Sequence, residues 1–204
     1  EVTADEILKR ALRFKPYWGK DGGITISGGE PLLQIDFVIE LFKKAKELGI
    51  NTCIDTAGNP FTKEEPFFSK FEELMKYTDL LLLDLKEINP ARHKDLTGFD
   101  NSNIIEMAKY LSEINKPVWI RHVVVPNITE NEKYLYDLGY YIGGLKNLKA
   151  IDVLPYHDMG KIKYANLGID YPLKDTKPLP RERAIEAKKI VLQGIKDRRL
   201  EENK

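Results

Sequence analysis

Hydrophobic and polar positions along the chain follow two spacings, one typical of helices and one typical of buried strands. Apolar residues recur every three or four positions in six segments, which predicts helices over 7–14, 35–45, 67–75, 104–114, 131–145 and 181–195. Short β-branched or leucine-rich runs between them predict strands over 24–27, 51–55, 79–84, 118–125 and 150–154. This alternation of helices and strands predicts an α/β fold with parallel strands and right-handed crossovers.

Turn and cap residues bound several of these segments. Thr3 with Glu6, and Thr62 with Glu65, have the spacing of a capping box, which predicts two helix starts. Gly49 closes the second helix. The Pro- and Gly-containing stretch over 155–180 predicts a loop, and the charged tail after Gly194 is expected to fray.

Composition narrows the class of protein. The 204 residues are enough for one domain with a substantial core, so we expect a single domain over 1–204. The 32 basic and 32 acidic residues balance, which argues against nucleic acid or an anionic membrane as a partner. No apolar run approaches the ~20 residues that span a bilayer, and no signal peptide is visible. We therefore expect a soluble, cytoplasmic protein.

Polar residues directly follow four of the predicted strands. Any one of them has an ordinary structural explanation, as a tight turn or a helix cap. Together they predict more, because a curved parallel sheet gathers the carboxyl ends of its strands at one mouth, where ligands bind. Opposite charges there suit a zwitterionic amino acid or a cation. The residues are Gly28, Gly29 and Glu30, then Asp55 and Thr56, then Asp84 and Lys86, and finally His157.

The histidines and the cysteine are weighed separately. His157 lies in a loop just beyond a strand, which favours a role as a carboxylate-binding or hydrogen-bonding residue. His93 is expected at the surface, and packing within a strand explains His122. Cys53 is the single cysteine, so an intrachain disulfide or a site of several thiolates cannot form, and we expect it to be a small buried hydrophobe.

The motif Ile-Thr-Ile-Ser-Gly-Gly-Glu-Pro-Leu-Leu over 24–33 resembles the radical S-adenosylmethionine (SAM) superfamily. Residues 1–195 further resemble the glycyl-radical activating enzymes of that superfamily, in particular the family that activates pyruvate formate-lyase. Four more segments carry this likeness, at 49–58, 79–86, 116–126 and 154–168. The resemblance implies a partial (β/α)6 TIM-like barrel, represented here by about five βα units with the first strand missing.

The resemblance also implies roles for residues. In that family SAM is held at the positions of Gly28, Gly29, Glu30, Asp55, Asp84, Leu85, Lys86 and His157, with Arg121 as a weaker candidate. The positions of Asp55, Thr56 and Asp84 match a site for a monovalent cation, Na⁺ or K⁺.

The chemistry implied is that of a radical oxidoreductase. Three cysteines in a Cys-x3-Cys-x2-Cys loop hold a [4Fe-4S] cluster, and one electron from a flavodoxin- or ferredoxin-type donor cleaves SAM to a 5′-deoxyadenosyl radical. That radical takes a hydrogen from a glycine of the partner, here most simply pyruvate formate-lyase. The cofactors supply the hard chemistry and the protein positions them.

This chain departs from the pattern because Cys53 stands alone and the cluster loop is absent. The chain also starts at Glu1, without a methionine, so we expect it to be N-terminally truncated. We predict that, as given, it neither assembles the cluster nor cleaves SAM. Two alternatives stay open: an activating enzyme for a different glycyl-radical enzyme, and a cluster-free SAM-binding module.

Overall fold

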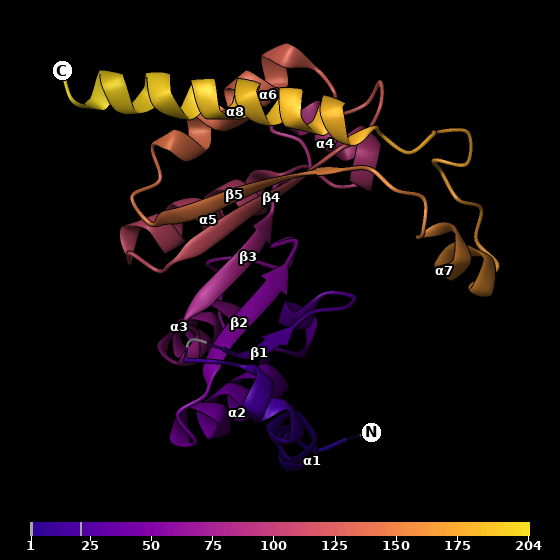
Figure 1. The fold of residues 1–204 in the computed structure, drawn as a ribbon. Helices are drawn as coiled ribbons and strands as arrows, with labels where there is room; N and C mark the ends of the chain where they lie inside the picture. Colours follow the sequence, from indigo (N-terminus) through magenta and orange to yellow (C-terminus); the bar gives the residue numbers. More distant parts are fainter. Residues whose placement is uncertain (1, 21) are drawn as a thin grey trace. The chain divides into compact units, whose positions relative to one another are not determined.

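The computed structural model describes residues 2–20 and 22–204 and contains alternating helices and strands (Figure 1). The strands are β1 (Gly23–Ile26), β2 (Asn51–Thr56), β3 (Leu80–Asp84), β4 (Val118–Val124) and β5 (Leu148–Pro155). The α-helices are α1 (Ala4–Ala11), α2 (Ile35–Glu47), α3 (Phe67–Tyr77), α4 (Pro90–Thr97), α5 (Ser102–Glu113), α6 (Glu132–Gly143), α7 (Lys161–Asn166) and α8 (Arg181–Glu202). Two 3₁₀-helices, η1 (Leu12–Tyr17) and η2 (Pro31–Gln34), complete the elements.

The strands form one five-stranded sheet in the order β1-β2-β3-β4-β5. Strand β2 pairs in parallel with β1 and with β3, placing Ile26 beside Ile54 and Thr56 beside Leu83. Each strand is followed by at least one helix before the next begins, as parallel neighbours require. The predicted α/β class with five parallel strands is confirmed.

The chain divides into two compact units. The first unit comprises Glu1–Asp84, Ser102–Ile120 and Lys146–Ala150, and the second comprises Leu85–Asn101, Arg121–Leu145 and Ile151–Lys204. Each unit is described separately below. A single domain over 1–204 stays a prediction.

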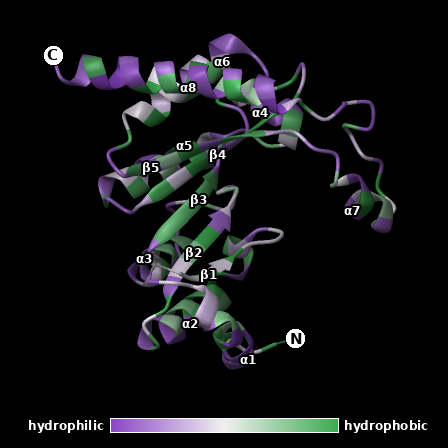
Figure 2. Cartoon of the chain, in the orientation of Figure 1, coloured by the Kyte–Doolittle hydropathy of each residue, from purple (hydrophilic) through white to green (hydrophobic). Residues whose placement is uncertain are grey.

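The core of the first unit is built on β3 and on a cluster of aromatic rings. Leu81 and Leu83 of β3 are fully buried, and Figure 2 shows this strand as strongly hydrophobic. Phe61, from the loop after β2, is also fully buried and meets Phe71 of α3 edge to face, with ring centroids 5.0 Å apart. Burial of each such side chain contributes about 1.5–3 kcal/mol, so this cluster holds the loop after β2 against α3.

The second unit is organised around the close packing of α6 against α8, which lie side by side in Figure 1. Two glycines make this approach possible. A Cβ atom at Gly139 would lie 2.0 Å from the carbonyl oxygen of Val191, and one at Gly194 would lie 2.4 Å from that of Tyr136. Any larger residue at either position would push the helices apart.

Element boundaries show where local patterns were reliable. The capping box at Thr3 is confirmed, since its amide donates to Glu6 Oε2 at 2.9 Å and its hydroxyl accepts from the Glu6 amide at 3.3 Å. The prediction of a capping box at Thr62 is wrong. Its hydroxyl accepts from the Glu64 amide at 3.2 Å, in a turn, and α3 begins only at Phe67.

The segment after Gly194 was also mispredicted. It does not fray, because α8 continues to Glu202. An ion pair between Arg198 and Glu202, one turn apart at 2.9 Å, supports this last part of the helix. The predicted loop over 155–180 contains the short helix α7.

Within residues 2–20 and 22–204, no helix combines the length and the apolar character needed to cross a membrane.

Candidate functional site

The turn after β1 is set by two glycines. Gly28 and Gly29 have φ angles of +88° and +54°, in the left-handed region where other residues are strained. No atom lies within 4 Å of the position that a Cβ would take at either glycine, so the main chain is open on that side. A ligand could lie directly against this backbone.

Glu30 closes the turn and ties it to the end of β2. Its Oε1 accepts from the Leu32 amide at 3.1 Å, which caps η2, and from the Thr56 hydroxyl at 2.6 Å. Its Oε2 accepts from the Ala57 amide at 2.9 Å. A carboxylate has about four acceptor positions, so these three bonds leave room for about one further donor, such as an amino group.

Thr56 is the other half of this connection. Its side chain is buried, with 2% exposed, and its hydroxyl also accepts from the Gly58 amide at 2.9 Å. Asp55 and Asp84, at the ends of β2 and β3, are both half-buried. In the first unit the structure therefore brings Glu30 and Thr56 into contact, as the parallel order of their strands requires.

The second unit contains the remaining predicted residues. Leu85 is buried, Lys86 and Arg121 are half-buried, and His157 is exposed. The Leu85 amide donates to the carbonyl of Arg121 at 3.0 Å, which continues the strand pairing to β4. The main chain just before Lys86 is thus fixed by a hydrogen bond to β4.

His157 follows a residue that is fixed on two sides. The Tyr156 amide donates to the Val124 carbonyl at 3.1 Å, and its hydroxyl is 2.9 Å from that of Tyr171. Burial, and then the hydrogen bond with Tyr171, raise the pKa of the Tyr156 phenol. Tyr156 therefore stays neutral, and the exposed His157 extends from a well-anchored backbone.

The other two histidines support the backbone around them. His93 is buried, with 3% exposed, and its Nδ1 lies 2.7 Å from the Phe99 carbonyl oxygen, so the prediction of a surface residue is wrong. Helix α4, which turns His93 inward, was visible in the sequence only as a polar segment. His122 is buried, and its Nδ1 lies 2.7 Å from the carbonyl oxygen of Leu85, so packing explains it as expected.

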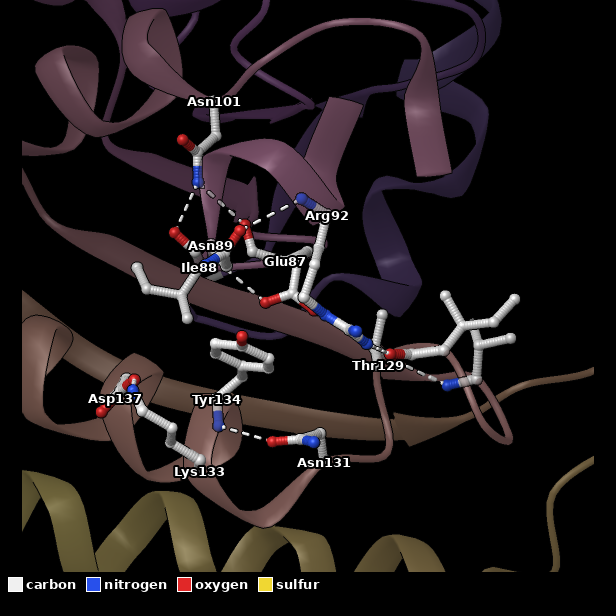
Figure 3. Close-up of polar contacts among 12 residues, drawn as sticks. Glu87, Ile88, Asn89, Arg92, Asn101, Thr129, Asn131, Lys133, Tyr134 and Asp137 are labelled. Carbon is white, nitrogen blue, oxygen red and sulfur yellow. Dashed lines mark hydrogen bonds and ion pairs between the residues drawn. The ribbon is translucent and has the colours of Figure 1, made fainter. Parts of the chain in front are cut away.

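Sequence reasoning missed an ion pair next to Lys86, between a buried glutamate and a half-buried arginine. Glu87 is 2% exposed, and its Oε2 accepts from Arg92 Nε at 3.1 Å (Figure 3). The signal was present: along an extended chain, alternate residues share a face, so Glu87 belongs with the buried Leu85 and not with Lys86.

A cavity of about 590 Å³ lies elsewhere in the second unit, and Arg92, Tyr164 and Tyr171 are among its lining residues. None of the predicted site residues lines this cavity. It is therefore distinct from the predicted SAM residues.

The side chains in this chain do not fit a [4Fe-4S] cluster. Such a cluster needs several thiolate ligands, and Cys53 is the single cysteine of the sequence. Cys53 was predicted to be buried, but the structure shows it half-buried in β2. In residues 2–20 and 22–204, no group of three or more His, Cys, Asp or Glu side chains is placed to hold a metal ion.

Comparison with known proteins decides the family. The model of the radical SAM superfamily matches residues 1–139, which is more than half of the chain. The chain belongs to the radical SAM superfamily. As a member, it is an enzyme of the radical SAM oxidoreductase type.

Two curated relatives within the superfamily are similar over nearly the whole chain. The pyruvate formate-lyase-activating enzyme of Streptococcus mutans is 51% identical over 94% of this chain and 73% of its own length. The enzyme of the same name from Staphylococcus epidermidis is 45% identical over 94% of this chain and 76% of its own length.

A solved structure supports the fold. A domain of the pyruvate-formate lyase-activating enzyme of Bacteroides vulgatus superimposes with a TM-score of 0.67 at 24% identity, covering 84% of this chain and 94% of that domain. This radical SAM chain therefore shares its α/β architecture with that domain.

Proposed function

We propose that this chain is the core of an enzyme that activates pyruvate formate-lyase by SAM-dependent formation of a glycyl radical. The observation that carries the proposal is the 51% identity, over 94% of the chain, to an enzyme named for that activation. Membership of the radical SAM superfamily supports SAM as the cofactor.

The residues proposed to hold SAM act by positioning it. In the first unit, the open backbone of Gly28 and Gly29 and the remaining acceptor position of Glu30 suit the amino group of the SAM methionine moiety. Asp55 and Asp84 add carboxylates at the ends of their strands. When bound, SAM supplies the adenosyl group on which the radical chemistry depends.

In the second unit, Lys86 and His157 are proposed to bind the SAM carboxylate, because both side chains donate hydrogen bonds and Lys86 carries positive charge. Leu85 is proposed to contribute its backbone, and Arg121 is retained as a weaker candidate. The backbone amide of Leu85 donates a hydrogen bond to the Arg121 carbonyl, which supports this part of the proposed site.

A [4Fe-4S] cluster is part of the family chemistry, but the ligands for it are not in this chain, so we derive no electron-transfer step here. A monovalent cation, Na⁺ or K⁺, at Asp55, Thr56 and Asp84 is proposed from the resemblance to the family, and the oxygen donors of these side chains suit it. The Thr56 hydroxyl already bonds to Glu30 and to the Gly58 amide, so a cation would use its remaining lone pair.

The proposed activity also implies a protein partner, an electron donor and a cellular compartment. The partner is pyruvate formate-lyase, the electron donor is a flavodoxin or a ferredoxin, and the compartment is the cytoplasm.

Titration of SAM into the chain by calorimetry tests the proposed site. We expect Lys86→Ala and His157→Ala each to weaken SAM binding by about tenfold, the value of one charge-assisted hydrogen bond. Lys94→Ala is the matched control, because Lys94 is an exposed lysine of α4 in the same unit. Equal SAM affinities for all three variants and the wild type would overturn the site assignment.

A further inference from the structure

We propose that Glu87 and Arg92 are positioning residues for Lys86. The ion pair between the buried Glu87 and the half-buried Arg92 fixes the main chain beyond Lys86, from which the lysine side chain reaches the carboxylate of SAM. This inference rests on the proposed function, which assigns Lys86 to SAM, and it adds two residues that act through the main chain next to Lys86.

The first step is the burial of a charge. Glu87 is 2% exposed, and a buried carboxylate is costly unless it is paired and hydrogen-bonded. Its Oε1 accepts from the Asn89 amide at 3.1 Å, and its Oε2 accepts from Arg92 Nε at 3.1 Å (Figure 3). Both oxygens are therefore engaged by the start of α4.

The second step is that Arg92 contacts several elements of the second unit. Besides Glu87, its guanidinium donates to the Ile128 carbonyl, in the loop after β4, and lies 4.9 Å from the ring centroid of Tyr134 in α6. The planar guanidinium makes this possible, since it can pair with a carboxylate and stack on an aromatic ring at the same time. Arg92 thus ties the residue after Lys86 to the rest of the second unit.

The third step is the backbone on both sides of Lys86. The carbonyl oxygen of Leu85 lies 2.7 Å from His122 Nδ1. The side chain of Asn101, itself 2% exposed, donates to the carbonyls of Glu87 and Ile88 at 2.9 and 2.8 Å. Lys86 is therefore flanked by residues whose main chain is bonded to side chains of neighbouring elements.

A long lysine side chain loses up to about 2 kcal/mol of rotamer freedom when a ligand immobilises it. A fixed backbone limits the further cost of binding, because the main chain does not have to be ordered as well. If Arg92 is removed, the Glu87 carboxylate is left buried without its cation, and the segment must shift to give it another partner or solvent. Such a shift moves the main chain next to Lys86.

The test compares SAM with its decarboxylated analogue, S-adenosyl-3-methylthiopropylamine, by calorimetric titration of the full 204-residue chain. We expect Arg92→Gln and Glu87→Gln to weaken SAM binding by about tenfold and to leave binding of the analogue within about twofold of wild type. Arg183→Gln is the matched control, since Arg183 pairs in the same unit with Glu130, whose side chain is 21% exposed where that of Glu87 is 2% exposed. We expect it to bind both ligands as the wild type does.

A double variant separates positioning from simple loss of stability. Glu87→Met/Arg92→Leu replaces the ion pair by apolar side chains, which commonly restores stability. We expect its thermal midpoint to return close to that of the wild type while its SAM affinity stays reduced.

Three outcomes would overturn the inference. The double variant could bind SAM as tightly as the wild type, or the single variants could lose equal affinity for SAM and for the analogue, or they could lose none. A wild-type chain that binds neither ligand would instead overturn the proposed SAM site, and the role of the ion pair with it.

Discussion

At the scale of single residues, the carboxylate of Glu30 has a structural function besides any role in binding. It joins the turn after β1 to the end of β2 through the Thr56 hydroxyl and the Ala57 amide. Thr56 is buried, so its hydroxyl cannot exchange these bonds for water. The ends of β1 and β2, two of the strand ends that carry proposed SAM residues in the first unit, are therefore fixed to each other before any ligand binds.

Thr56→Val tests this connection. The variant keeps the shape of the side chain but leaves the Glu30 carboxylate and the Gly58 amide each short of one partner. We expect the free energy of unfolding to fall by about 1–3 kcal/mol, measured by urea denaturation. Thr25→Val, at an exposed position of β1, is the control, and a similar loss in both variants would contradict the prediction.

At the scale of elements, the packing of α6 on α8 depends on the absence of side chains at the contact. Gly139→Ala would place a methyl group 2.0 Å from the Val191 carbonyl oxygen, so the helices must separate. We expect a loss of about 1–3 kcal/mol of stability, measured by the shift of the urea midpoint. Gly160→Ala, where a Cβ would have only ordinary contacts, is the control and should change little.

Asp79, just before β3, connects three elements of the first unit. Its carboxylate accepts from Lys46 of α2 at 2.7 and 2.8 Å and from the Thr52 amide of β2 at 2.8 Å. Burial by itself would raise the pKa of this carboxyl, but the hydrogen bonds from Lys46 and Thr52 outweigh it, and the pKa is lowered.

This shift gives the stability a defined pH dependence. A carboxyl with a lowered pKa stabilises the fold above its unfolded pKa of about 3.9, and that contribution disappears as the pH falls through the folded value. We expect Asp79→Asn to be less stable than wild type near neutral pH, with the difference shrinking below about pH 4 in urea unfolding. Asp36→Asn, which removes an exposed pair with Lys70, is the control. A gap between Asp79→Asn and wild type that stays constant with pH would be inconsistent with this assignment.

At the scale of the whole molecule, a single cysteine limits what the chain can assemble. After anaerobic treatment with iron and sulfide, followed by desalting, we expect the chain to retain no [4Fe-4S] cluster, as judged by its visible absorbance and iron content. Reductant-dependent formation of 5′-deoxyadenosine should be absent as well.

Cys53→Ser is the matched variant for this experiment, and we expect it to behave as the wild type does. Bound iron in the wild type that Cys53→Ser lacks would show that this thiol takes part in a metal site, contrary to the prediction.

Much of the fold could be predicted from local patterns, because helix and strand periods are properties of neighbouring residues. The leucine run of β3 and the capping box at Thr3 are examples. The predictions of helix boundaries were wrong where one sequence pattern is compatible with two local structures. The Thr62 and Glu65 spacing forms a turn before Pro66, and the charged tail after Gly194 is held in α8 by side-chain pairs one turn apart.

By itself, the sequence determined the order of the five strands and of six of the helices, the glycine turn at Gly28 and the lack of cluster ligands, because these follow from residue type and spacing. Only the tertiary structure decided that Glu30 bonds to Thr56, that His93 is buried, and that Arg92 neutralises Glu87. In each of these contacts, the two partners lie on different elements or on different turns of the chain. Burial, which makes a polar group require a partner, is a property of the packed chain and not of any one segment.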